Sequence, residues 1–184
     1  MELLPFLRTQ VRANRLANHR LHAAMVTLTR AEFHAPRVSY FPSLAKTLNH
    51  ILAVDIYYVA ALRGEADMEA QWRSFTPCDT VSELAAAQAG VDERFIRFIE
   101  TLSAPQLDEV IALDRGHHVQ RERCGHVIAH LINHQVHHRG QAHALLAGTA
   151  VAPPQLDEFL MPSEAHLRSA DMAALGWRED QLFG

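Results

Sequence analysis

Apolar residues recur at alternating intervals of three and four in four stretches of the chain. This spacing places them on one face of a helix, so we expect four amphipathic helices. The row of the first helix contains two asparagines among apolar residues, and it comprises Leu7, Val11, Asn14, Asn18, Leu21, Met25 and Leu28. We expect the two asparagines to satisfy polar groups inside the protein.

Local signals mark the ends of the second and third helices. Ser43 is expected to cap the start of the second helix and Gly64 to end it. Thr80 and Glu83 have the spacing of a capping box at the start of the third helix, and Pro105 is expected to stop it. The row of the second helix is Leu44, Leu48, Ile51, Asp55, Tyr58 and Leu62, and that of the third is Leu84, Gln88, Val91, Phe95, Ile99 and Leu102.

The second half of the chain predicts one more long helix and two smaller features. The fourth helix is expected from about Glu122 to Ala147, closed by Gly148 in the left-handed conformation. Before it, the turn sequence Asp114-Arg115-Gly116 predicts a hairpin of two short strands within residues 110–120. An extended tail follows, with one short and largely exposed helix expected over residues 163–175.

Four helices with one apolar face each bury those faces most simply by packing against one another. The expected fold class is therefore all-α, a four-helix bundle with a small hairpin before its last helix. We assign residues 1–148 to this bundle and residues 149–184 to a C-terminal tail of the same domain. The connections alone do not decide the order of the helices, because residues 64–79 can either turn back locally or cross the end of the bundle.

Charge and composition narrow the classes of function. The net charge of -4, from 17 basic and 21 acidic residues, disfavours a nucleic-acid partner. No stretch approaches the roughly 20 apolar residues of a membrane span, and residues 1–14 lack the apolar core of a signal peptide. We therefore expect no membrane partner and no secretion. Cys78 and Cys124 lie far apart, which argues against a disulfide framework and favours a cytoplasmic location.

Histidine is over-represented, with 13 residues, eight of them between His117 and His143. In the fourth helix, His134 and His138 lie one turn apart on the expected buried face, where one metal ion can bridge them. A third ligand must come from another helix, and His50 is the only histidine in the apolar body of the second helix. A chain of this length buries a full core without a structural ion, so we expect the metal to serve chemistry.

Other interpretations of the histidines remain open at this point. The pair can be core histidines bonded to backbone, water or carboxylates such as Asp55, although their spacing and density favour a metal site. Cys124 and His126 lack a second such pair, and the H-E-x-x-H pattern of zinc proteases is absent. The other histidines of this region are expected to lie beside the site or in solvent: His126, His130 and His137 to one side, and His117, His118 and His143 in solvent.

The sequence Asn133-His134-Gln135-Val136-His137-His138-Arg139-Gly140-Gln141 resembles the N-H-x-x-H-H-R-G-Q motif of the DinB-like metalloenzyme family. The segment Thr47-Leu48-Asn49-His50-Ile51-Leu52, followed by Asp55, is similar to the motif of the family's second helix. Asn14-Arg15-Leu16-Ala17-Asn18 resembles that of the first helix. The resemblance implies an up-down-down-up four-helix bundle, often a homodimer, with a divalent metal held by His50, His134 and His138.

The resemblance has two limits. Family members often carry aromatic residues where this chain has Ala13 and Leu16, which predicts a difference in packing or pocket shape. The tail beyond Pro162 matches nothing in the motifs and has no assigned role.

Three neutral imidazoles leave coordination positions open, as in catalytic rather than structural sites. Zinc is the first candidate, and nickel, iron and manganese are alternatives. The resemblance implies a thiol S-transferase or isomerase for a small-molecule substrate, with a low-molecular-weight thiol, in detoxification or stress response. A metal-dependent hydrolase and a noncatalytic metal-binding or interaction module are the alternatives. No catalytic residue is assigned.

The polar neighbours of the histidines have separate expected roles. Gln141 is expected to bond an imidazole or to pack between helices. Arg139 is expected to hold a carboxylate at the bundle or dimer surface. Asp55 lies about 140 degrees around its helix from His50, which favours an ion pair or an outer-shell role. The polar groups that Asn14 and Asn18 satisfy can include the free nitrogen of a ligand histidine.

Overall fold

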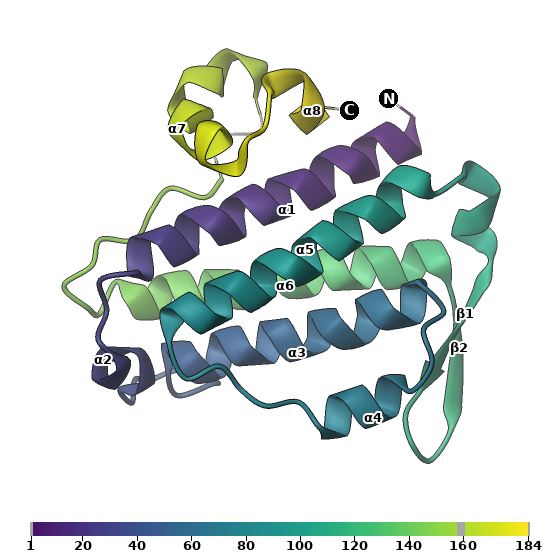
Figure 1. The fold of residues 1–184 in the computed structure, drawn as a ribbon, viewed down its shortest axis with the longest axis horizontal. Coiled ribbons are helices and arrows are strands. Elements are labelled where there is room, and N and C mark those ends of the chain that lie inside the picture. The colour runs from purple at the N-terminus through teal and green to yellow at the C-terminus, as the bar shows by residue number, and fades with distance from the viewer. Residues whose placement is uncertain (1, 158–160, 184) are drawn as a thin grey trace.

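The computed structural model describes residues 2–157 and 161–183, and it is mostly helical with one small two-stranded sheet (Figure 1). Its four long helices are α1 (Leu3–Met25), α3 (Leu44–Leu62), α5 (Val81–Thr101) and α6 (Cys124–Leu146). Helix α1 packs against α5 and α6, and α3 packs against the same two helices. The all-α prediction is therefore confirmed at the level of fold class. None of the described helices is long and apolar enough to cross a membrane.

The predicted helix caps of α3 and α5 form as expected. The hydroxyl of Ser43 accepts a hydrogen bond from the backbone N–H of Lys46 at 3.1 Å. Thr80 and Glu83 form a complete capping box. Gly64 follows α3 with a φ of 65°, a left-handed conformation that glycine adopts without a steric penalty. The bonds of Ser43 and of the capping box satisfy N–H groups that the first turn of a helix cannot pair within itself.

The predicted hairpin is confirmed between α5 and α6. Strands β1 (Val110–Asp114) and β2 (Val119–Arg123) pair in antiparallel register, with Asp114 opposite Val119. Gly116 has a φ of 80°, and its N–H donates to the Asp114 carboxylate at 2.8 Å. Because β2 includes Glu122, α6 begins later than the sequence predicted.

The expected end of the fourth helix is wrong in its detail. Gly148 does not adopt a positive φ. Its N–H instead donates to the carbonyl of Leu145 at 3.2 Å, after Ala147 in a right-handed conformation. This tighter last turn satisfies the end of the helix without a left-handed residue. The left-handed cap occurs at Gly176, where φ is 67°.

Short helices were missed by the periodicity, because a few residues do not establish a helical period. These short helices are α2 (Arg30–His34), α4 (Met68–Arg73) and α8 (Glu179–Phe183), with 3₁₀ turns at Ala104–Asp108 and Pro162–Glu164. Leu28, which the spacing placed in the first helix, lies beyond the end of α1, in the segment before α2.

The tail helix α7 (Ala165–Leu175) is mostly exposed, as predicted, but two of its residues, Arg168 and Met172, are buried. Helices α7 and α8 pack on the outer face of α1 (Figure 1). Met172 is buried with Ala13 and Leu16 of α1, so the two residues that depart from the family pattern contact the tail. Arg168 is fully buried, and its Nε donates to the Glu179 carboxylate at 3.1 Å. This packing is compatible with one domain, and the domain boundaries stay a prediction.

A network of buried polar side chains connects the long helices, and one part of it surrounds Asp55. The Gln88 amide donates to the carboxylates of Asp55 at 2.7 Å and Asp92 at 3.0 Å. Gln135 of α6 also donates to Asp55. Burial raises the pKa of Asp55 well above its usual range and that of Asp92 to about 6. Asp55 therefore bonds two glutamine amides. Among the described residues it forms neither the expected ion pair nor an outer-shell bond to a histidine of the site.

The other part of the network contains Arg139, whose predicted place at a surface is wrong. Arg139 is only 8% exposed, and its guanidinium donates to the Asn18 side-chain oxygen at 3.0 Å and to that of Asn14. The Asn18 amide in turn donates to Asp92 at 3.0 Å. Burial lowers the pKa of Arg139 to about 10. The two asparagines thus satisfy this arginine and Asp92 rather than a histidine of the site.

The burial of His22 on α1 predicts that the stability of the fold decreases at low pH. His22 is 6% exposed, and burial, with the charges of Arg15 and Arg139, lowers its pKa to about 3 from 6.5. The unfolded chain therefore binds more protons between these pH values, so stability from His22 is present above pH 6.5 and is lost as pH falls. Between pH 7 and 4, the wild type should lose roughly 3 kcal/mol relative to His22→Leu.

Urea unfolding of the metal-free proteins at pH 7 and pH 4 measures this difference. The exposed His166, replaced by glutamine, is the control and should keep the wild-type pH dependence. Equal pH dependence of the wild type and His22→Leu would contradict the effect of burial on His22.

Candidate metal centre

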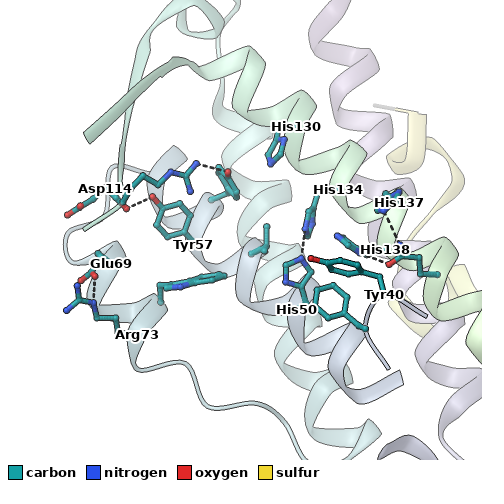
Figure 2. A pocket seen from close by; sticks show the side chains of 16 residues that line it. Tyr40, His50, Tyr57, Glu69, Arg73, Asp114, His130, His134, His137 and His138 are labelled. Carbon is teal, nitrogen blue, oxygen red and sulfur yellow. Dashed lines mark hydrogen bonds and ion pairs between the residues drawn. The ribbon is translucent and has the colours of Figure 1, made fainter. Parts of the chain in front are cut away.

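The structure brings together the three histidines that the sequence predicted as ligands. His50 comes from α3, and His134 and His138 come from successive turns of α6 (Figure 2). One nitrogen from each ring lies within 4.8 Å of the others. The Nε2 atoms of His50 and His134 are 3.0 Å apart. No carboxylate or thiol of the described residues joins this group.

The spacing of these nitrogens fits one metal ion. Two nitrogens at the usual distance from a tetrahedral zinc ion are about 3.3 Å apart. The 3.0 Å between His50 and His134 is close to that value. Three protein ligands leave at least one coordination position free, which is typical of catalytic metal sites. The residues present therefore fit a divalent metal centre with an open position.

Gln141 orients one of the three imidazoles. Its side-chain oxygen lies 2.8 Å from His138 Nδ1 and can only accept, so that nitrogen carries the proton. The Nε2 lone pair of His138 then remains for a metal ion. The Gln141 amide nitrogen donates to His137 Nε2 at 3.1 Å. Of the two expected roles of Gln141, the bond to an imidazole is therefore the one observed.

His134 has no comparable partner. Its Nδ1 is buried and lacks a hydrogen bond within residues 2–157 and 161–183. Burial, and then the charges that the neighbouring histidines would carry, lower the pKa of His134 to about 3. Burial also lowers the pKa of His50. Both rings therefore stay neutral near pH 7, which is the form that binds metal.

The remaining histidines do not join the site. His126, His130 and His137 are exposed, and the ring centre of His130 is 6.2 Å from that of His134. His117 and His118 are exposed on the hairpin turn, as expected. His143 was expected in solvent but is partly buried, with Nε2 2.9 Å from the Pro154 carbonyl oxygen.

Cys124 is buried in the core at the start of α6, where burial raises the pKa of its thiol to about 11. A thiol that resists ionisation is a poor metal ligand, since the thiolate is the binding form. This agrees with the exclusion of the pair formed by Cys124 and His126.

The three histidines open into a cavity of about 920 Å³. Aromatic side chains cover much of its wall, and the ring centre of Phe41 lies 4.5 Å from that of His50. The cavity explains why His134, expected at the centre of a buried face, is only partly buried. The aromatic residues of the wall are Tyr40, Phe41, Tyr57, Tyr58 and Trp72.

The sequence pattern assigned none of these aromatic residues to the site, although it placed Tyr58 in the apolar row of the second helix. A signal for Tyr57 was present, because it lies two helical turns after His50 and therefore near the same face of α3. No comparable signal existed for Trp72 on the short α4 or for Arg115 on the hairpin turn. Only the folding of these two elements over the end of α3 and α6 brings them to the cavity.

Comparison with known proteins supports the resemblance. The model of the DinB family matches residues 5–172, which extends into α7 and therefore beyond the motifs that carried the resemblance. Protein DinB of Bacillus subtilis strain 168 is 24% identical over an alignment of 152 residues, which covers 78% of this chain and 87% of that protein. The residues that the family model matches, 5–172, contain all three histidines of the site.

Proposed function

Because this chain belongs to the DinB family, we propose that it is a metal-dependent enzyme that uses a low-molecular-weight thiol. The activity would be that of a thiol S-transferase or isomerase for a small organic molecule, in detoxification or stress response. The observation that carries this proposal is the convergence of His50, His134 and His138 at the wall of a cavity of about 920 Å³. A cavity of this size accommodates an organic substrate.

The roles of the residues follow from their positions. His50, His134 and His138 would hold the ion, with zinc as the first candidate and nickel, iron or manganese as alternatives. A bound divalent ion supplies Lewis acidity and an open position suited to a thiolate sulfur. Gln141 fixes the orientation of His138 through the bond at 2.8 Å. The aromatic wall provides an apolar surface for the substrate.

Further parts of the proposal concern topology and assembly. We place the four long helices in up-down-down-up order. Figure 1 supports this order, since α2 lies at one end of the helices, the hairpin lies at the other, and the connection through α4 runs along their length. We also propose a cytoplasmic homodimer without nucleic-acid or membrane partners, with residues 1–148 and 149–184 in one domain.

The proposed thiol binding has a direct spectroscopic test. Titration of glutathione, bacillithiol or mycothiol into the cobalt-substituted protein should produce a sulfur-to-metal charge-transfer band, because thiolate is a good ligand for an open position on such a metal. The band should be absent in His138→Ala. The His130→Ala variant is the matched control, since His130 is an exposed histidine that lines the same cavity, and it should retain the band.

Two other outcomes favour the alternatives. Absence of a band with every thiol, together with metal-dependent ester or amide hydrolysis, would support a hydrolase. Absence of both would support a noncatalytic metal-binding module.

A further inference from the structure

Arg115 lies in the same cavity as the three histidines but comes from a different part of the fold. It occupies the turn between β1 and β2 and is partly buried. Its neighbours Tyr57 and Asp114 lie at one side of the cavity, and His50, His134 and His138 lie at the other (Figure 2). The hairpin therefore brings a permanent positive charge to the end of the cavity away from the metal centre.

Two tyrosines hold the guanidinium of Arg115 in place. Its central carbon lies 5.2 Å from the ring centre of Tyr57 and 5.4 Å from that of Tyr58, which are cation–π contacts. One Nη2 hydrogen bond reaches the Tyr58 hydroxyl at 2.9 Å, and Nε donates to Gln120 at 3.2 Å. Both acceptors are neutral. A guanidinium has five N–H groups, so these bonds orient it and leave donors for a ligand.

Arg115 has no acidic counterpart in the part of the chain that the structure describes, since no ion pair links it to a carboxylate there. The two carboxylates that line the cavity bond groups other than Arg115. Glu69 pairs with Arg73 on α4. The Asp114 carboxylate accepts the Gly116 N–H at 2.8 Å. A partly buried arginine without a carboxylate partner is a suitable site for the anionic group of a ligand.

We propose that Arg115 binds the carboxylate of an organic substrate whose aromatic or apolar body lies along the aromatic wall. The flat, forked guanidinium matches a carboxylate in shape and charge. Tyr57, Tyr58 and Trp72 line the cavity beside it and favour an apolar body. The inference rests on the proposed function only in placing the reactive end of the substrate at the three histidines. Arg115 thus determines which substrates bind and in which direction they lie.

The test compares two probes that differ in charge and have nearly the same shape, naphthalene-1-carboxylate and naphthalene-1-carboxamide. Calorimetric titration of the wild type should show tighter binding of the carboxylate by roughly 10- to 100-fold, the effect of hydrogen bonds to a charged group. Arg115→Gln should abolish this preference. Arg121→Gln is the matched control, because Arg121 is an exposed arginine of the same hairpin that does not line the cavity, and it should retain the preference.

Measurements with and without metal separate this inference from the proposed function. The preference for the carboxylate should persist after chelation, since Arg115 does not depend on the ion. A preference that disappears on chelation and survives in Arg115→Gln would place the carboxylate on the metal and overturn the inference. Absence of binding by both probes would also overturn it. Persistence in the metal-free protein, with no thiol band in the cobalt protein, would support Arg115 and contradict the thiol-dependent function.

A second variant distinguishes a loss of the Arg115 contact from misfolding of the protein. Arg115→Lys keeps the charge but loses the forked geometry, and it should retain part of the preference for the carboxylate. Circular dichroism and the melting temperature of each variant establish that it is folded. A folded Arg115→Gln or Arg115→Lys variant with the full wild-type preference would refute the role of Arg115.

Discussion

Replacement of His134 or His138 by alanine should lower the metal content of the purified protein from about one divalent ion per chain to nearly none. Each substitution leaves only two of the three nitrogens that lie within 4.8 Å of one another. Two neutral ligands do not retain an ion through purification when no carboxylate of the described residues can replace the third. Elemental analysis of the purified variants measures this loss.

Chelation of the wild type separates a catalytic from a structural ion. Chelation of the wild type should lower its melting temperature, by an amount that corresponds to about 3 kcal/mol at a metal concentration 100 times the dissociation constant. The helical circular dichroism signal should remain, because the buried apolar residues form the core without the metal centre. Loss of most helical signal on chelation would identify the ion as structural.

His143→Ala is the matched control for the metal measurements. His143 lies on the same helix but bonds the Pro154 carbonyl, away from the three ligands, so its replacement should leave metal content unchanged. If His134→Ala and His138→Ala both kept their metal, the assignment would be wrong, and His126, His130 and Cys124 would be examined next.

Replacement of Arg139 by methionine should cost about 3 to 5 kcal/mol of the free energy of unfolding. The guanidinium donates to the side-chain oxygens of Asn14 and Asn18, and its charge also favours the ionised forms of Asp92 and Asp55. Methionine fills much of the volume but leaves two buried amide oxygens without this donor. It also removes the charge that compensates the buried carboxylates. Urea unfolding of the metal-free protein at pH 7 measures the loss.

A matched surface arginine provides the comparison for Arg139. Arg123 forms an ion pair at 3.2 Å with Asp108, and their side chains are 62% and 77% exposed. Arg123→Met should therefore cost about 1 kcal/mol or less. The double variant Arg139→Met with Asp92→Asn should recover part of the loss, because it removes one of the uncompensated carboxylates. A loss for Arg139→Met no larger than that for Arg123→Met would show that the buried network contributes little to stability.

The sequence predicted those elements whose stability comes from local interactions. The helical rows, the Ser43 cap and the capping box of Thr80 and Glu83 depend on residues close together in the chain. The i, i+4 spacing of His134 and His138 is likewise a property of one helix. The motif around these histidines and His50 then identified the family, which the match over residues 5–172 confirms.

Other predictions failed where the partner of a residue lies on a distant segment. Arg139 was expected at a surface, because the sequence does not show that Asn14 and Asn18 of α1 face it across the bundle. The tail helix likewise has a buried side that its sequence did not indicate, since Met172 packs against Ala13 of α1. Helical periodicity gives the direction of a side chain around its own axis but not the element that it meets.

The sequence by itself determined the four long helices, the hairpin, the family and the three histidines that converge on one site. Only the tertiary structure decided the shape of the cavity, since its wall combines α3, α6, the short α4, the hairpin and the segment of Tyr40 and Phe41. It also decided that Arg115 faces this cavity between Tyr57 and Tyr58. The physical reason is that local hydrogen bonds and helical spacing are encoded over a few residues. A cavity depends instead on the packing of segments that are far apart in the chain.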